Sequence, residues 1–242
     1  MSPRLLAALT AALTLSFAAS PLLVPDFGGF EPDQFPVPQV APPVQPAGYA
    51  FAIWGVIYLW LIVGMGFGLL RRAQDPRWQA MRAPLCVSLA VGTSWLPVAV
   101  QSPVWAAVLI WVMLLSALLA LYRAPEADRI WAAYPIGLYA GWLSAASCVA
   151  LGLVSAGYGY LDAQAAALIF VFIALVLASA VQSSLRRTPT YALAVIWALV
   201  AVVVQNRAGD QLIAALAAGG AAALLIPAYK ALRSERRSHE VA

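Results

Sequence analysis

The chain has 242 residues, of which 63% are hydrophobic and 10% are charged, and its mean hydropathy is +0.84. Soluble domains are about 45–50% apolar and about 25% charged, so the composition excludes an ordinary water-soluble fold. The net charge of +4 does not indicate a nucleic-acid binder, because the chain is so apolar. One His and two Cys are too few ligands for a metal site.

Eight apolar stretches are each long enough to cross a bilayer, which takes about 20 residues with a range of about 17–25. The apolar runs are continuous rather than alternating, which favours helices over a β-barrel. We therefore predict an all-α, polytopic membrane helix bundle with eight transmembrane helices. In chain order, the spans are expected at Leu5–Val24, Ala47–Leu70, Ala83–Val100, Pro103–Leu121, Ile130–Leu153, Ala163–Ser183, Pro189–Val204 and Gln211–Leu232.

The basic residues fix the expected orientation of these spans. With the N-terminus inside, thirteen of the fourteen Lys and Arg residues fall on the inner side, and Arg207 alone falls outside. Lys and Arg collect on the cytoplasmic side of a membrane. We expect a multi-pass protein of the bacterial inner membrane with both termini in the cytoplasm.

The first span has a second interpretation. Met1–Ser20 has the basic start, apolar run and small residues of a signal peptide. We expect the span to be retained, because its apolar stretch continues to Val24. Cleavage would leave seven spans with the remaining loops on the same sides. The proline-rich segment at residues 25–46 follows, and we expect it to lie extended across the outer mouth of the bundle.

The second span carries an aromatic face. Phe51, Trp54 and Tyr58 have the spacing of residues that share one side of a helix. Trp54 lies eight residues after Pro46, roughly 12 Å deep at 1.5 Å per residue. That depth is too great for the aromatic belt at the headgroups.

Trp111 and Trp142 lie well inside the fourth and fifth spans, and Trp95 lies in the outer half of the third span, beside Pro97. Deep tryptophans pack between helices, face lipid or line a cavity. An aromatic wall with few polar groups suits a large, flat, apolar ligand such as a porphyrin or a sterol.

Several of these residues resemble the signature of the TspO/MBR family, the tryptophan-rich sensory proteins related to the mitochondrial translocator protein. The first part of the resemblance lies in the second span, at Pro46, Tyr49, Phe51, Trp54 and Tyr58. The second part lies in the third and fifth spans, at Trp95, Pro135, Tyr139, Trp142 and Ala146. The long loop between the first two spans also fits this family.

The resemblance implies a five-helix bundle over residues 1–156, with a pocket open toward the long loop. The family binds porphyrins and other flat hydrophobic ligands, and in purple bacteria it is associated with tetrapyrrole- and photosynthesis-related expression. The resemblance implies no covalent cofactor, only a tetrapyrrole or similar hydrophobic ligand. The implied wall residues are Tyr49, Phe51, Trp54, Trp95, Tyr139 and Trp142.

Residues 157–242 are predicted to form a three-helix transmembrane extension with a basic cytoplasmic tail. Eight of the nine tryptophans lie before residue 161, and the last three spans are mostly Ala, Leu and Val. Two small-residue pairs permit close helix contact, Gly64 with Gly68 and Gly137 with Gly141. They mark interfaces within the bundle or, alternatively, the contact face of a homodimer or larger membrane complex.

The spans contain no Asp, Glu, Arg or His, and no catalytic set of side chains can be assembled from them. An ion-coupled carrier usually needs ionisable groups inside the membrane. We therefore expect neither an enzyme nor such a carrier. The first hypothesis is a binding or regulatory protein for a tetrapyrrole or similar ligand. The alternatives are an accessory subunit of a photosynthetic or other energy-transducing complex, and passive transport of an apolar metabolite.

Overall fold

The computed structural model describes residues 1–24 and 28–240, with the backbone alone at residue 23 and residues 236–240. Within these ranges the chain is all-helical and contains no strand, and the eight predicted helices are confirmed. They are α1 (Pro3–Ala19), α2 (Ile53–Arg72), α3 (Pro76–Ala99), α4 (Pro103–Tyr122), α5 (Ala133–Gly157), α6 (Ala163–Leu185), α7 (Thr190–Asn206) and α8 (Gln211–Glu240). Short 3₁₀ helices η1 (Ser20–Leu23), η2 (Pro32–Gln34) and η3 (Gly48–Ala52) lie between α1 and α2.

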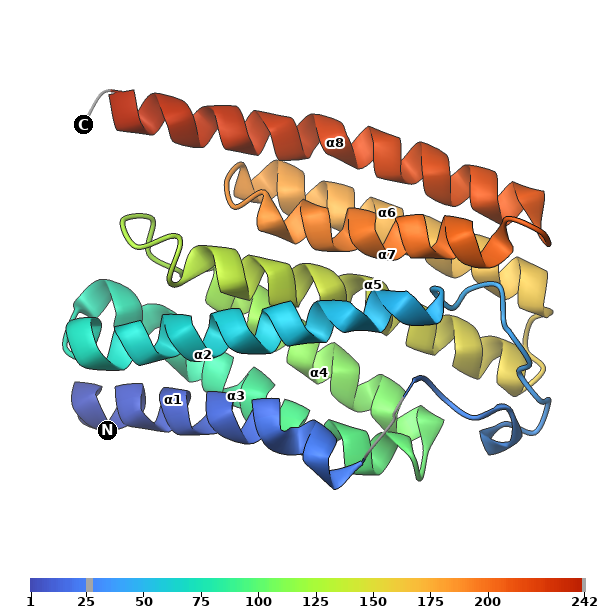
Figure 1. The fold of residues 1–242 in the computed structure, drawn as a ribbon, viewed down its shortest axis with the longest axis horizontal. Helices are drawn as coiled ribbons and strands as arrows, with labels where there is room; N and C mark the ends of the chain where they lie inside the picture. The colour runs from blue at the N-terminus through green and yellow to red at the C-terminus, as the bar shows by residue number, and fades with distance from the viewer. Residues whose placement is uncertain (25–27, 241–242) are drawn as a thin grey trace.

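Six segments among the described residues are long and apolar enough to cross a membrane; they comprise α1, α2, α4, α5, α6 and α8. The apolar helix α7 has only 17 residues, and the first turns of α3 carry Arg77 and Arg82. The helices lie side by side along the long axis of the molecule, and the two chain termini lie at the same end (Figure 1). This arrangement is that of a multi-pass membrane bundle.

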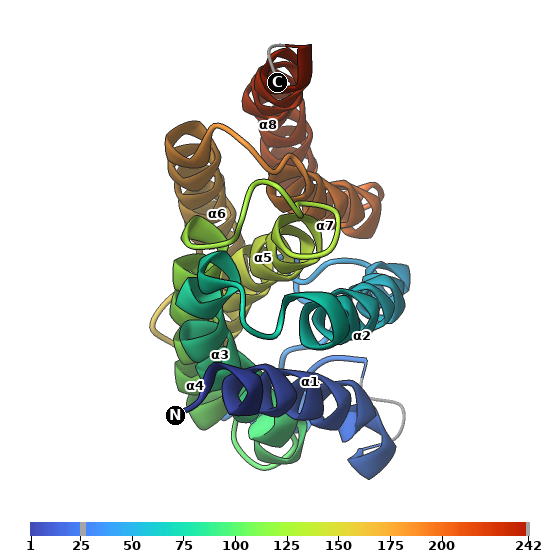
Figure 2. The same ribbon diagram turned by 90° about the vertical axis from the view of Figure 1, so that its left-hand side faces the viewer.

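Helix α5 is the centre of the bundle, with α4, α6 and α7 packed around it and α1 and α8 on opposite sides of the molecule (Figure 2). In the most apolar 18-residue stretch of α5, 78% of the residues are buried. In the same stretch of the other five candidate spans, 28% to 50% are buried. The many small residues of α5 make this possible. At Gly141, for example, an added Cβ would collide with the backbone of Tyr191 on α7.

The four glycines of the two small-residue pairs all contact other parts of this chain. Gly64 lies against Trp131, Gly68 against Trp78, Gly137 against Thr188 and Thr190, and Gly141 against Tyr191. Each pair therefore lies at a close contact within the bundle. A homodimer or larger complex stays a prediction.

A polar clamp holds the ends of α2 and α3 to the α4–α5 loop, at the end of the bundle that carries the termini. Asp128 accepts two hydrogen bonds from the Arg72 guanidinium, at 2.8 and 3.2 Å, and one from the indole of Trp78, at 2.8 Å. Nearby, the buried Arg82 donates to the carbonyl oxygens of Gly68, Arg72 and Ala73 at the end of α2. The carbonyls of Arg72 and Ala73 lie beyond the last i to i+4 hydrogen bond of α2, so Arg82 helps to close the helix end.

Candidate functional site

A cavity of about 460 Å³ lies among the first five helices, toward the end of the bundle opposite the two termini. Each of the five helices contributes to its wall, and so does the 3₁₀ turn that follows α1. Its lining residues include Phe17, Ser20, Phe51, Trp54, Tyr58, Gly92, Trp95, Ile110, Met113, Trp142 and Ala146. We call this space the aromatic cavity.

The predicted aromatic face of the second span forms one wall of the aromatic cavity. Trp54 and Tyr58 stack, with ring centroids 5.3 Å apart and planes 20° apart. Phe51 lies in η3, two residues before α2 begins, and still reaches the same wall. Phe17 of α1 packs edge-on against Trp54 at 5.8 Å and against Tyr58 at 5.2 Å.

Trp142 and Trp95 form the facing walls. The indole of Trp142 on α5 lies edge-on to Phe51 at 5.9 Å and to Trp54 at 6.2 Å. Trp95 on α3 donates its indole N–H to the carbonyl oxygen of Ala106 on α4, at 2.9 Å. This bond satisfies the polar edge of Trp95 and leaves its apolar ring at the cavity wall.

The structure places Tyr139 and Tyr49 away from the lining. Tyr139 is fully buried beneath the aromatic cavity, 6.3 Å from the ring of Trp54, and its hydroxyl makes a 2.9 Å hydrogen bond with Ser88 on α3. Tyr49 is 46% exposed and packs edge-on against Trp197 of α7. Four of the six predicted wall residues, Phe51, Trp54, Trp95 and Trp142, therefore come together around the cavity.

A family model described as TSPO-like protein matches residues 37–229. The chain belongs to the TSPO-like protein family. The matched region begins in the loop before η3 and extends into α8, so it includes α6 and α7 as well as α2 to α5. Comparison with curated proteins and with solved structures gives no match.

Several wall residues of this TSPO-like protein were not anticipated in the sequence analysis, and Phe17 and Gly92 are two of them. Phe17 lies in the segment that also reads as a signal peptide, and its burial depends on how α1 packs. Gly92 lets the Phe17 ring approach α3, because an added Cβ would lie 2.6 Å from that ring. The sequence signal for this contact is weak, since neither residue belongs to a motif.

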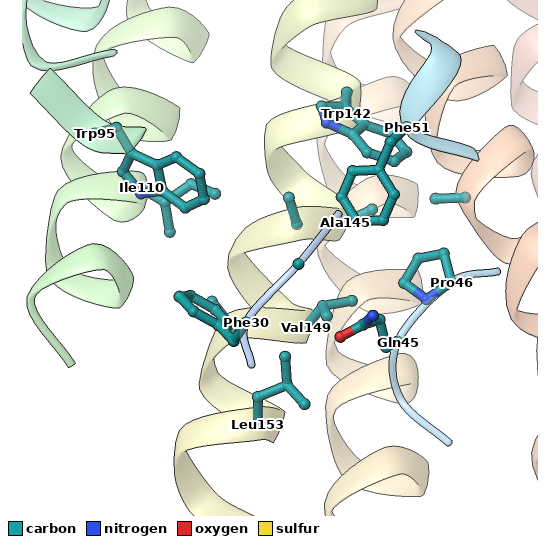
Figure 3. A pocket seen from close by; sticks show the side chains of 14 residues that line it. Phe30, Gln45, Pro46, Phe51, Trp95, Ile110, Trp142, Ala145, Val149 and Leu153 are labelled. Carbon is teal, nitrogen blue, oxygen red and sulfur yellow. The ribbon is translucent and has the colours of Figure 1, made fainter. Parts of the chain in front are cut away.

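Residues 28–46 of the loop between α1 and α2 cover the cavity at the end of the bundle opposite the termini. The loop contributes Phe30, Gln45 and Pro46 to an adjoining space of about 60 Å³, where Figure 3 shows them facing Val149 and Leu153 of α5. Three hydrogen bonds tie the loop to three different helix ends: Gln34 Nε2 to Ala99 O at 2.9 Å, Val37 N to Gly157 O at 2.9 Å, and Asn206 Nδ2 to Pro43 O at 2.8 Å. Residues 28–46 of the predicted segment thus lie over the cavity, whereas residues 25–27 lie outside the described residues and the placement of the loop on the outer side of a membrane stays a prediction.

The lining of the aromatic cavity is mostly apolar. Among the described residues, the lining contains no Asp, Glu, Lys, Arg or His, and its polar side-chain groups are the hydroxyls of Ser20 and Tyr58 and the indole N–H groups. The indoles of Trp54 and Trp142 make no hydrogen bond among the described residues, so both are available as donors to a ligand. Such a wall holds a ligand by apolar contact and orients it with a few donors.

Proposed function

We propose that this TSPO-like protein binds a flat, hydrophobic ligand such as a tetrapyrrole in the aromatic cavity and acts as a binding or regulatory protein without chemical turnover. The observation that carries the proposal is the convergence of Phe51, Trp54, Trp95 and Trp142 on one cavity of about 460 Å³. Sites for small molecules usually measure about 300–1,000 Å³, are mostly apolar and carry few polar groups. The cavity has this size and this composition.

The geometry of the rings supports a planar ligand. Phe17 and Trp142 meet Trp54 edge-on, at interplanar angles of 83° and 82°, so the walls meet at steep angles. Aromatic rings bind other π-systems either in offset stacks or edge to face. A planar macrocycle could stack on one of these rings while its edge meets another.

The test is quenching of tryptophan fluorescence by protoporphyrin in detergent. Ala146 lines the aromatic cavity, so Ala146→Phe fills it and keeps every tryptophan. Ala215→Phe makes the same change on the exposed side of α8. We expect Ala146→Phe to weaken protoporphyrin binding about tenfold or more, the equivalent of at least 1.4 kcal/mol, and Ala215→Phe to bind as the unchanged protein does. Equal affinities in all three proteins would contradict the proposal.

We further propose that the protein lies in a bacterial inner membrane with both termini in the cytoplasm. Both termini lie at one end of the bundle (Figure 1), and α2 and α3 meet at that end through a turn rich in arginine. The positive-inside rule places such an end in the cytoplasm. The aromatic cavity and the loop that covers it would then face the periplasmic side.

A further inference from the structure

A second cavity, of about 390 Å³, lies at the opposite end of the molecule from the aromatic cavity. The α4–α5 loop, the α6–α7 loop and α8 surround it, and these segments come together at the end of the bundle that carries the termini (Figure 2). Its lining includes the charged and polar residues Glu126, Arg129, Arg186, Arg187, Thr188, Ser234 and Glu235. We call this space the basic cavity.

Both carboxylates of the basic cavity accept hydrogen bonds from this chain. Glu126 accepts a hydrogen bond from Arg187, at 2.7 Å. Glu235 is buried, with 8% of its surface exposed, and uses both oxygens: one accepts from the Tyr134 hydroxyl at 2.6 Å and the other from the Thr188 backbone N–H at 2.9 Å. Each carboxylate of the cavity therefore already has a donor from this chain, and the second oxygen of Glu126 faces solvent, with 77% of that side chain exposed.

Two of the three arginine side chains that line the basic cavity have no hydrogen-bond or ion-pair partner among the described residues. Within the described part of the chain, the guanidinium groups of Arg129 and Arg186 make no hydrogen bond and no ion pair, whereas Arg187 bonds both Glu126 and the carbonyl oxygen of Tyr122. The basic cavity therefore holds unused positive charge and unused donors. Guanidinium groups present paired donors that match the oxygens of phosphate.

The α6–α7 loop is held in an uncommon conformation beside this charge. Arg186 and Thr188 both have positive φ, 53° and 55°, which is rare for a β-branched residue such as threonine. The Thr188 hydroxyl is also buried without a hydrogen-bond partner among the described residues. Strained backbone of this kind persists where the surrounding structure fixes it, often at a ligand site.

We propose that the basic cavity binds a phosphate group through Arg129 and Arg186. Its three arginines outnumber its two glutamates, and basic pockets between helices on the cytoplasmic side of a membrane bind the head groups of anionic lipids. The same phosphate chemistry also occurs in soluble phosphate compounds, so the two sources need separate tests. This proposal is independent of the ligand in the aromatic cavity.

The experiment measures the thermal unfolding midpoint of the full chain in a neutral detergent at fixed ionic strength. One series adds short-chain phosphatidylglycerol and a second adds inorganic phosphate. A ligand of the folded state raises the midpoint with increasing concentration and yields an apparent Kd. The double variant Arg129→Gln/Arg186→Gln removes the proposed donors. The control Arg4→Gln/Arg71→Gln removes two exposed charges from the same end of the bundle, outside the cavity.

We expect a saturable rise in at least one series, with the apparent Kd about tenfold or more higher in the double variant and within about twofold of the unchanged protein in the control. A response to phosphatidylglycerol alone assigns the site to a lipid head group, and a response to inorganic phosphate assigns it to a free phosphate. The proposal is wrong if neither probe binds, if the double variant binds as the unchanged protein does, or if the control loses as much affinity.

Discussion

Two tryptophans of this protein differ in whether the indole N–H makes a hydrogen bond. Trp78 is fully buried and donates to Asp128 at 2.8 Å. Trp111 lies half-buried on α4, outside the aromatic cavity, and its indole N–H is buried without a partner among the described residues. A buried donor left without an acceptor costs about 1–3 kcal/mol, so the two residues should respond differently to the same substitution.

We expect Trp78→Phe to destabilise the protein by about 1.5–3 kcal/mol, because a hydrogen bond to a charged group is lost. Trp111→Phe removes the same atoms together with an unpaired donor, so we expect a change within about 1 kcal/mol of zero. Thermal unfolding of both variants in one detergent measures the difference. An equal loss of stability in the two variants would contradict this prediction, because the two indoles differ in hydrogen bonding.

At the scale of elements, the Asp128 clamp joins α2 and α3 to the α4–α5 loop. The hydrogen bond from Arg72, followed by that from Trp78, holds the pKa of Asp128 below its ordinary value of 3.8, against the opposing effect of burial. A carboxyl group with a depressed pKa stabilises the fold fully above the pKa it has when unfolded. That contribution is lost as the pH falls through the lower pKa of the folded state.

We therefore predict that acid weakens the clamp below about pH 4. Asp128→Asn should lower the unfolding midpoint at neutral pH and make it fall less steeply with acid than in the unchanged protein. Asp33→Asn removes a carboxylate from the exposed loop and should leave the steepness unchanged. Unfolding midpoints between pH 7 and pH 3 measure both effects, and parallel curves for Asp128→Asn and the unchanged protein would contradict the prediction.

The helices were predictable because each is a long apolar run. Their boundaries are set by capping and hydrogen-bonding side chains, which a hydropathy pattern does not reveal. The third span was predicted from Ala83, whereas α3 begins at Pro76. Asp75 caps it by accepting from the Arg77 N–H, and its polar first turns are held by the clamp and by Arg82. A prediction from apolar residues alone therefore leaves those polar turns out of the helix.

The candidate site was predictable only in part, for a similar reason. Helical spacing placed Trp54 and Tyr58 on one face, and the structure confirms that face. Tertiary packing decided the rest: Tyr49 lies in η3 and turns toward Trp197, while Phe17 enters the wall from α1. The basic cavity joins three segments far apart in the sequence, so no local pattern could indicate it.

At the scale of the whole molecule, the proposed orientation makes the two ends differ in accessibility. Ser2 lies at the end that carries the termini and Gly209 in the loop between α7 and α8 at the other end, and both are exposed. In intact cells with a permeabilised outer membrane, we expect a membrane-impermeant maleimide to label Gly209→Cys and not Ser2→Cys. The native Cys86 and Cys148 are buried and give little background. The reverse labelling would contradict the orientation.

The ligand proposal joins α1 to α5 into one functional unit, because each of them contributes to the aromatic cavity. The most direct measurement is an experimental structure of the full chain with protoporphyrin bound. We predict planar density among Trp54, Trp95 and Trp142, beneath the loop that carries Phe30. Density for the macrocycle at the lipid-facing surface, with the aromatic cavity empty, would contradict the account.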